Sequence, residues 1–120
     1  MELAVTIAVM GILASIALPQ FLKYSQTARR ADAQVALNLQ VQNLERCRVK
    51  RASYIGCSIS ADESPDEHYR LRLTNVTRSS YNLIANAQGA QAKDTECSFL
   101  AIDSEGVRAA SSNVERCWSN

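Results

Sequence analysis

The sequence predicts an α+β protein in which a long N-terminal α-helix packs on a four-stranded antiparallel sheet. The prediction rests on an uncharged first segment at residues 3–22, on helical periodicity that continues to about Arg51, and on the strand-like runs that follow. A chain of 120 residues is long enough for one domain. We divide it into an apolar helix at residues 1–25 and a head at residues 26–120.

The first segment is long and apolar enough to cross a bilayer. About 20 helical residues span about 30 Å, which is the thickness of the hydrocarbon core. A cleaved signal peptide has a shorter apolar region with small residues at its cleavage site, whereas Pro19, Gln20 and Phe21 stand behind this one. We therefore expect the segment to stay attached as a membrane anchor and to continue into the second half of the helix.

Three residues of this segment do not suit a plain anchor. Glu2 stands at the edge of the apolar run, where a carboxylate is costly in a bilayer unless it finds a partner. Gly11 lowers helix propensity, and Pro19 removes a backbone donor and clashes with the preceding turn. The helix is therefore expected to be weak between Gly11 and Pro19.

These residues, with the apolar ones between them, resemble the N-terminal signature of type IV pilins, in which glutamate, glycine and proline keep fixed separations. The resemblance implies that Glu2 pairs with the N-terminal amine of a neighbouring subunit and that Pro19 bends the helix. It also implies that the helix can unwind from Gly11 to Pro19 in a filament. A leader peptide and a methylated residue precede this glutamate in the family, so we expect Met1 to lie a few residues inside the mature sequence.

The C-terminal half carries a looser resemblance to the type IVa branch. It consists of Asp94 with Cys97, the turn at residues 103–106, and the closing pair Cys117 and Trp118. Together the motifs imply the pilin fold over nearly the whole chain, with a variable surface loop between Cys97 and Cys117.

The function that the resemblance implies is structural. The subunit would wait in the bacterial inner membrane and be moved by the pilus assembly machinery there into an extracellular filament, as a homopolymer or a copolymer with other pilins. Such filaments serve adhesion, twitching motility or DNA uptake. The alternatives are a minor pilin that binds DNA or a surface, and a type II secretion pseudopilin, which the lack of a calcium-loop pattern disfavours.

The second half of the helix carries apolar residues on two opposite sides. At about 100° per residue, one stripe is formed by Ala33, Leu37, Val41 and Leu44, and the other by Ala28, Ala31, Val35 and Leu39. A helix that lies on one domain needs a single stripe. We expect the first stripe to pack on the sheet and the second to contact helices of neighbouring subunits. The alternative is a helix wedged inside one domain.

The remainder of the chain has strand-like alternation between turns. The expected strands are residues 69–73, 81–86, 97–102 and 107–110. Polar residues at 75–80 and 103–106 predict turns, and residues 87–96 predict a loop. Gly56 is the expected helix breaker, so the helix should stop near residues 54–56. The resulting meander would pack on the helix.

The cysteines predict covalent cross-links and not a metal site. None of the four, Cys47, Cys57, Cys97 and Cys117, lies in a Cys-x-x-Cys pair, and His68 is the sole histidine. Their even number behind an apolar leader indicates two disulfides formed in an oxidising compartment. Of the three pairings we favour Cys47–Cys57 and Cys97–Cys117, since each closes a local loop and would stabilise the fold by roughly 3 kcal/mol. No catalytic residues, metal or cofactor are expected, so the protein is not read as an enzyme.

Two groups of basic residues form a candidate contact for DNA or a protein partner. Arg46, Arg48, Lys50 and Arg51 cluster at the helix end, and Arg70 and Arg72 share one face of the first strand. Together they would neutralise several phosphates. The alternatives are pairing with Glu45, with the acidic residues at 62–67, or with acidic surfaces of adjacent subunits. We favour the alternatives because the net charge is only +1.

Overall fold

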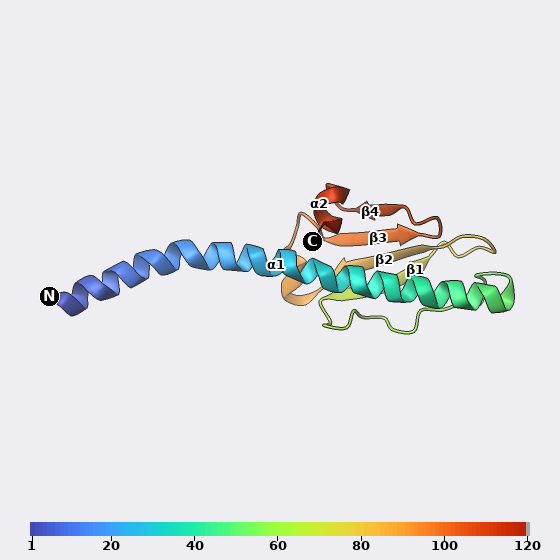
Figure 1. The fold of residues 1–120 in the computed structure, drawn as a ribbon, viewed down its shortest axis with the longest axis horizontal. Coiled ribbons are helices and arrows are strands. Elements are labelled where there is room, and N and C mark those ends of the chain that lie inside the picture. The colour runs from blue at the N-terminus through green and yellow to red at the C-terminus, as the bar shows by residue number, and fades with distance from the viewer. Residues whose placement is uncertain (120) are drawn as a thin grey trace.

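The computed structural model describes residues 1–119 and consists of one long helix with a small sheet beside its second half (Figure 1). Its elements are α1 (Glu2–Arg51), β1 (Tyr69–Thr74), β2 (Asn82–Ala87), the 3₁₀-helix η1 (Gly89–Lys93), β3 (Phe99–Asp103), β4 (Arg108–Ala110) and α2 (Val114–Trp118). The long helix gives the molecule an extent of 76 Å along its longest axis. The predicted fold class is confirmed.

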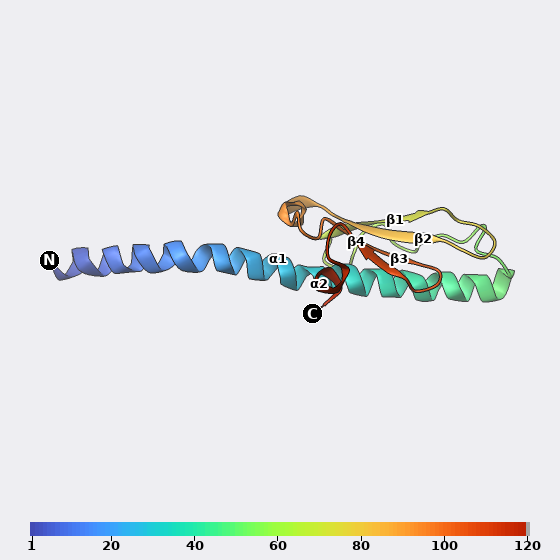
Figure 2. The ribbon, with the colours of Figure 1, turned by 90° about the horizontal axis from the view of Figure 1, so that it is seen from above.

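The sheet is an antiparallel meander in the order β1-β2-β3-β4. Its register places Leu71 opposite Ala85, which in turn lies opposite Leu100. Because side chains alternate along a strand, these residues point to one face. Figure 2 shows that this face is covered by the second half of α1, while the other face is free.

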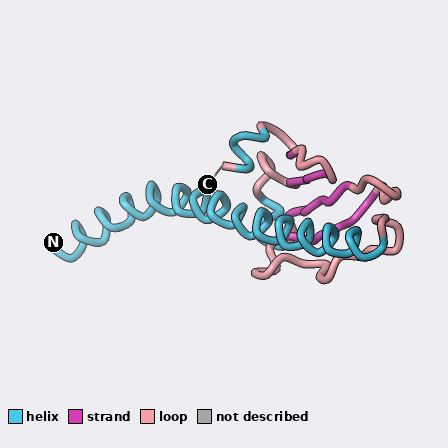
Figure 3. Tube along the Cα trace, turned by 45° about the vertical axis from the view of Figure 1, so that its right-hand side comes forward, coloured by secondary structure: helices cyan, strands magenta, loops and turns pink. Residues whose placement is uncertain are grey.

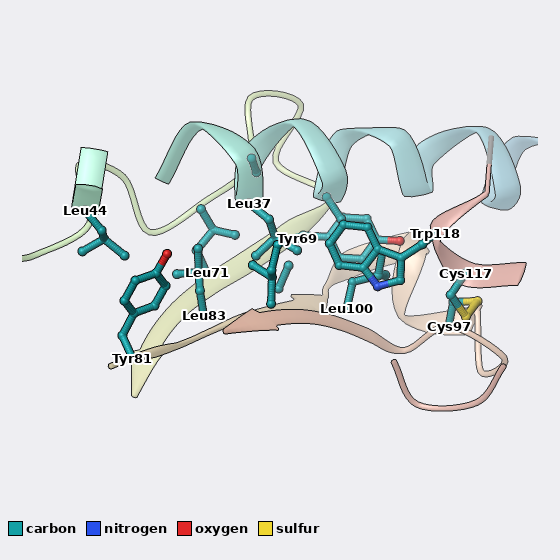
Figure 4. Close-up of a cluster of buried hydrophobic side chains, with 14 of the residues drawn as sticks. Leu37, Leu44, Tyr69, Leu71, Tyr81, Leu83, Cys97, Leu100, Cys117 and Trp118 are labelled. Atoms are coloured by element: carbon teal, nitrogen blue, oxygen red, sulfur yellow. A yellow bond between two sulfur atoms is a disulfide. The ribbon is translucent and has the colours of Figure 1, made fainter. Parts of the chain in front are cut away.

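The core lies between α1 and the sheet (Figure 4). In β1, β2 and β3 buried side chains alternate with less buried ones, and the helix contributes the stripe that contains Leu37 and Leu44. The buried apolar residues are Ala33, Ala36, Leu37, Leu44, Tyr54, Cys57, Tyr69, Leu71, Tyr81, Leu83, Ala85, Cys97, Leu100, Ile102, Cys117 and Trp118. None of them precedes Ala33, so the head has a core of its own.

The two predicted stripes of α1 have different environments. Ala33, Leu37 and Leu44 are fully buried against the sheet, and Val41 packs at the margin of the core. On the opposite side Val35 is 50% exposed and Leu39 is 46% exposed. The alternative of a helix wedged inside one domain is therefore wrong, because the second apolar stripe stays about half exposed.

The end of α1 differs from the prediction. The helix stops at Arg51, and Ala52 adopts the left-handed conformation with φ 56° while its N–H bonds to the carbonyl of Arg48 at 2.7 Å. Gly56 also has a positive φ, of 86°, but it lies in the following turn and does not end the helix. Glycine is favoured at a left-handed cap because it has no Cβ, which is why the prediction chose it over an alanine.

The strands agree with the prediction within one or two residues at each end. The predicted loop at residues 87–96 contains η1, and the predicted C-terminal loop contains α2; neither short helix was predicted. The side chain of Asn113 caps α2 by accepting from the N–H of Arg116 at 2.8 Å.

Both predicted disulfides are present. Cys47 is bonded to Cys57, which ties the loop after α1 back to the last turns of the helix. Cys97 is bonded to Cys117, which holds α2 against the start of β3. The cross-links lie at opposite ends of the head, so each fixes a loop that the sheet itself does not hold.

Candidate assembly and nucleic-acid interfaces

The N-terminal part of α1 projects away from the head (Figure 3). Every residue from Met1 to Tyr24 is exposed, including large apolar side chains such as Leu3 at 81% and Ile7 at 68%. Among the described residues it is the one helix long and apolar enough to cross a membrane. An exposed apolar surface of this extent indicates an interaction with lipid or with other proteins.

The predicted assembly residues all lie on this projecting segment. Glu2 occupies the first turn of α1, and Gly11 and Pro19 are inside the helix, which is continuous through both. The predicted weakness between Gly11 and Pro19 therefore stays a prediction. A Cβ on Gly11 would meet no atom within 4 Å, so the glycine is not required by packing within this chain.

A buried ion pair joins α1 to the head where the projecting segment ends. Arg30 is 5% exposed and Asp94, in the segment after η1, is 3% exposed. The guanidinium donates to both carboxylate oxygens, at 2.8 and 2.9 Å. Hydrogen bonding to Asp94 raises the pKa of Arg30 above its ordinary value. A bidentate pair of this kind fixes orientation as well as charge.

Further polar contacts surround this pair. Gln91 is fully buried, and its side-chain amide donates to the carbonyl of Gln26 at 2.9 Å and to the hydroxyl of Tyr69 at 3.0 Å. Glu96 lies 2.5 Å from Arg116 and 3.5 Å from Arg30. The hydrogen bond from Arg116 lowers the pKa of the Glu96 carboxyl. The projecting helix is thus held to η1 and to the C-terminal loop at one place.

The connection between α1 and β1 runs back along the helix. The carboxylate of Asp32, 7% exposed, accepts from the hydroxyl of Ser64 and from the N–H of Asp66 at 3.0 Å. Gln40 holds the same connection through the N–H of Ser60 at 2.9 Å. The acidic residues of this connection therefore lie beside the first half of the head, far from the end of α1.

The opposite end of the head is basic. Over residues 45–55 and 75–80 the chain has five basic side chains and one carboxylate, Glu45. We call the five residues Arg46, Arg48, Lys50, Arg51 and Arg78 the basic end. All five are exposed, and among the described residues none forms a salt bridge. The N–H of Tyr54 donates to the carbonyl of Arg78 at 3.2 Å, which brings the two segments together.

A buried tyrosine supports this end. The hydroxyl of Tyr54 donates to Glu45 at 2.5 Å and accepts from Arg48 at 3.2 Å. Its ring packs edge-on to Tyr81 with the centroids 4.8 Å apart. Basic side chains in a last helical turn also interact favourably with the helix dipole, so part of the cluster has a structural explanation.

The structure does not join the two basic groups predicted from the sequence. Arg70 and Arg72 do share one face of β1, but it is the face turned away from α1. Arg70 lies 3.5 Å from Glu63, so its charge is already paired. Arg70 and Arg72 thus lie on a strand face and the other four basic residues at a helix end, and a joint contact with one partner stays a prediction. Arg78, which completes the basic end, was missed because it is a single charge in a polar turn.

The chain matches known proteins in sequence and in fold. Residues 19–101 match the model of a family described as type IV minor pilin ComP, DNA uptake sequence receptor. The chain belongs to the type IV pilin family.

A solved type IV pilin from Shewanella oneidensis is 31% identical to this pilin, with a TM-score of 0.61 over 79% of this chain and 99% of that chain. The non-core minor pilin PilV of Neisseria meningitidis is 15% identical, with a TM-score of 0.63 over 75% of this chain and 90% of that chain, and it shows the fold alone. No curated protein matches this pilin significantly.

Proposed function

We propose that this pilin is anchored in the inner membrane by residues 3–22 and is then transferred into a type IV pilus with other pilins. The observation that carries the proposal is the contrast between a fully exposed apolar segment and a head with a complete core. In lipid the segment is solvated by acyl chains, and in a filament it would be covered by helices of neighbouring subunits. The transfer therefore costs little hydrophobic free energy.

Two features of α1 would direct this transfer. The half-exposed stripe with Val35 and Leu39 continues the apolar surface of the first segment into the head. Glu2, at the far end, would pair with the N-terminal amine of a neighbour. Pairing would offset the desolvation of both charges and fix the axial register of the subunits.

The test is the incorporation of Glu2→Ala into pili. The variant should insert into the membrane and fold normally but be poorly incorporated. Thr6→Ala is the matched control, because Thr6 is an exposed polar residue of the same segment whose hydroxyl bonds only to the carbonyl of Glu2 in the described structure. Normal incorporation of Glu2→Ala would contradict the role of this residue.

We further propose that this pilin is a minor subunit that binds DNA through the basic end. The family description names a DNA uptake receptor, which supports a DNA ligand. The unpaired charges of the basic end, at the part of the head farthest from the membrane segment, support the place of contact (Figure 1). Phosphate contacts of this kind provide affinity without sequence readout.

Binding can be tested on the soluble head, residues 26–120, because no core residue lies before Ala33. Each phosphate contact contributes about 0.9 to the slope of log affinity against log salt concentration. Arg51→Gln with Arg78→Gln should therefore lower the slope by about 1.8 and weaken binding to all sequences. Arg72→Gln removes an exposed charge from the outer face of β1 and should change neither the salt slope nor the affinity for DNA. Weak, salt-insensitive binding by the unmodified head would overturn the DNA proposal.

A further inference from the structure

We propose that the base of the head carries a binding groove for the phosphate of an anionic phospholipid. The groove has a volume of about 420 Å³ and lies between α1 and the segment that follows η1. Pro19 and Leu22, at the end of the apolar segment, line it together with Lys23 and Lys93. It thus combines an apolar wall, continuous with the membrane anchor, with two ammonium groups. The inference rests on the membrane-anchored stage of the proposed function and adds a ligand to it.

The charges around the groove leave these two lysines unbalanced. The acidic residues that line it are Asp94 and Glu96. Asp94 is paired with Arg30, and Glu96 with Arg116 and Arg30. Lys23 and Lys93 are exposed and form no salt bridge among the described residues. The available charge in the groove is therefore positive, which favours an anion.

The position of the groove matches the depth of lipid headgroups. If residues 3–22 fill the hydrocarbon core, Lys23 stands at its outer boundary. Gln26, whose carbonyl binds Gln91 of η1, is four residues beyond Leu22 and therefore about 6 Å farther along the helix. The headgroup layer on each side of a bilayer is about 5–8 Å thick. The η1 segment and Lys93 thus lie at the level of the phosphates.

The polar contacts of the junction hold the groove in place. The bonds from Gln91 to Gln26 and from Arg30 to Asp94 fix η1 and the following residues on α1, so Lys93 stays in the wall of the groove that Lys23 also lines. A basic residue near an anionic bilayer surface contributes about 1 kcal/mol, which is about fivefold in binding. The two lysines would seat the head on the membrane until the subunit leaves for the filament.

The experiment measures amide hydrogen exchange of the full chain in nanodiscs of phosphatidylcholine, with and without phosphatidylglycerol. Exchange in the segment from Gly89 to Glu96 should be slower with phosphatidylglycerol, by up to about fivefold for each lysine that contacts a phosphate. Lys23→Gln with Lys93→Gln should abolish the difference. Arg51→Gln with Arg78→Gln is the matched control and should retain it, because that end of α1 lies about 40 Å from the bilayer.

Each other outcome is decisive. Equal exchange in the two kinds of nanodisc would overturn the proposed site. Slowing by inorganic phosphate in pure phosphatidylcholine, equal to that by phosphatidylglycerol, would show a site for free phosphate and would overturn the lipid assignment. If the chain does not enter nanodiscs, both the proposed membrane anchor and the proposed phosphate site are wrong. If it enters them but phosphatidylglycerol does not slow the exchange, only the phosphate site is wrong.

Discussion

The two halves of α1 form one continuous helix, but they differ in sequence and in environment. From Met1 to Tyr24 every residue is exposed, whereas between Arg30 and Leu44 one side of the same helix is buried under the sheet. The first half has no partner in the described chain, and the second half has one on a single side. A continuous helix thus connects a segment that needs an external partner to a head that folds by itself.

This comparison separates stability from assembly. The head has its core, its disulfides and its buried ion pair after residue 29, so its free energy of unfolding should not depend on the projecting segment. The projecting segment contributes no residue to the core of the head, so its sequence is free to serve the membrane and the filament. Substitutions in the two regions should consequently have different effects.

Removal of residues 1–25 should have the largest effect, which should fall on assembly and not on the stability of the head. The remaining head should be soluble, with a melting temperature within about 4 °C of the full chain, because 1 kcal/mol would shift a domain of this size by about that much. Incorporation into pili should be lost completely. Calorimetry in detergent and in buffer checks the first statement, and pilus purification checks the second. A large loss of stability would show that the head depends on the segment.

Breaking the buried ion pair should have the next largest effect, and only on the head. Asp94→Ala leaves the guanidinium of Arg30 buried, which typically costs about 3–5 kcal/mol. The expected loss is near the lower end, because Glu96 remains 3.5 Å away. Urea denaturation of the head measures it. The double variant Arg30→Met with Asp94→Leu is the control and should recover most of the stability; a failure to recover would mean that the pair supplies more than charge compensation.

Removal of the C-terminal disulfide should have an effect of about the same size. Cys97 and Cys117 are 20 residues apart, and the chain-entropy model gives about 3.3 kcal/mol for a loop of this size, against about 2.8 kcal/mol for the shorter Cys47–Cys57 loop. Cys97→Ser with Cys117→Ser should therefore destabilise the head a little more than the corresponding change at Cys47 and Cys57. The denaturation midpoints of the two double variants measure the two losses of stability. A smaller loss for the Cys97 and Cys117 variant would show that α2 is held mainly by packing of Trp118.

The pH dependence of the head should show the smallest effect. Because the pKa of Glu96 is lowered in the folded protein, its contribution is present above the ordinary glutamate value of about 4.3 and is lost as the pH falls through the folded value. Glu96→Gln should be less stable than the unmodified head at neutral pH, and the difference should disappear in acid. Glu105→Gln is the control, since Glu105 forms no salt bridge among the described residues. A difference in stability between Glu96→Gln and the unmodified head that persists in acid would show that the charge of Glu96 is not its cause.

The sequence predicted the parts of the fold that repeat a local pattern. Alternation located the strands around Leu71, Leu83 and Leu100, and helical spacing separated the buried stripe of α1 from the exposed one. Local loops also predicted the disulfides. The short helices η1 and α2 were missed because five residues give too little periodicity to recognise.

The candidate functional residues could be predicted from the sequence only where they lie within one continuous segment. The assembly residues from Glu2 to Pro19 form a continuous motif. Arg30 and Asp94 are 64 residues apart, and nothing local marks them as partners. Whether Arg70 and Arg72 extend the basic group at the end of α1 likewise depends on how β1 and that helix end are oriented in the folded head, which no local pattern predicts. Ala52 ended the helix where a glycine was expected, because backbone conformation was inferred from residue type.

The central claim is that residues 1–22 stay attached and exchange lipid for contact with other pilin subunits. Mass spectrometry of pili purified from the native host tests it most directly. The account predicts that this pilin is found in the filaments and that peptides from the first 22 residues are recovered with those of the head. Recovery of head peptides alone, or of a protein that stays in the membrane as a monomer while functioning normally, would contradict it.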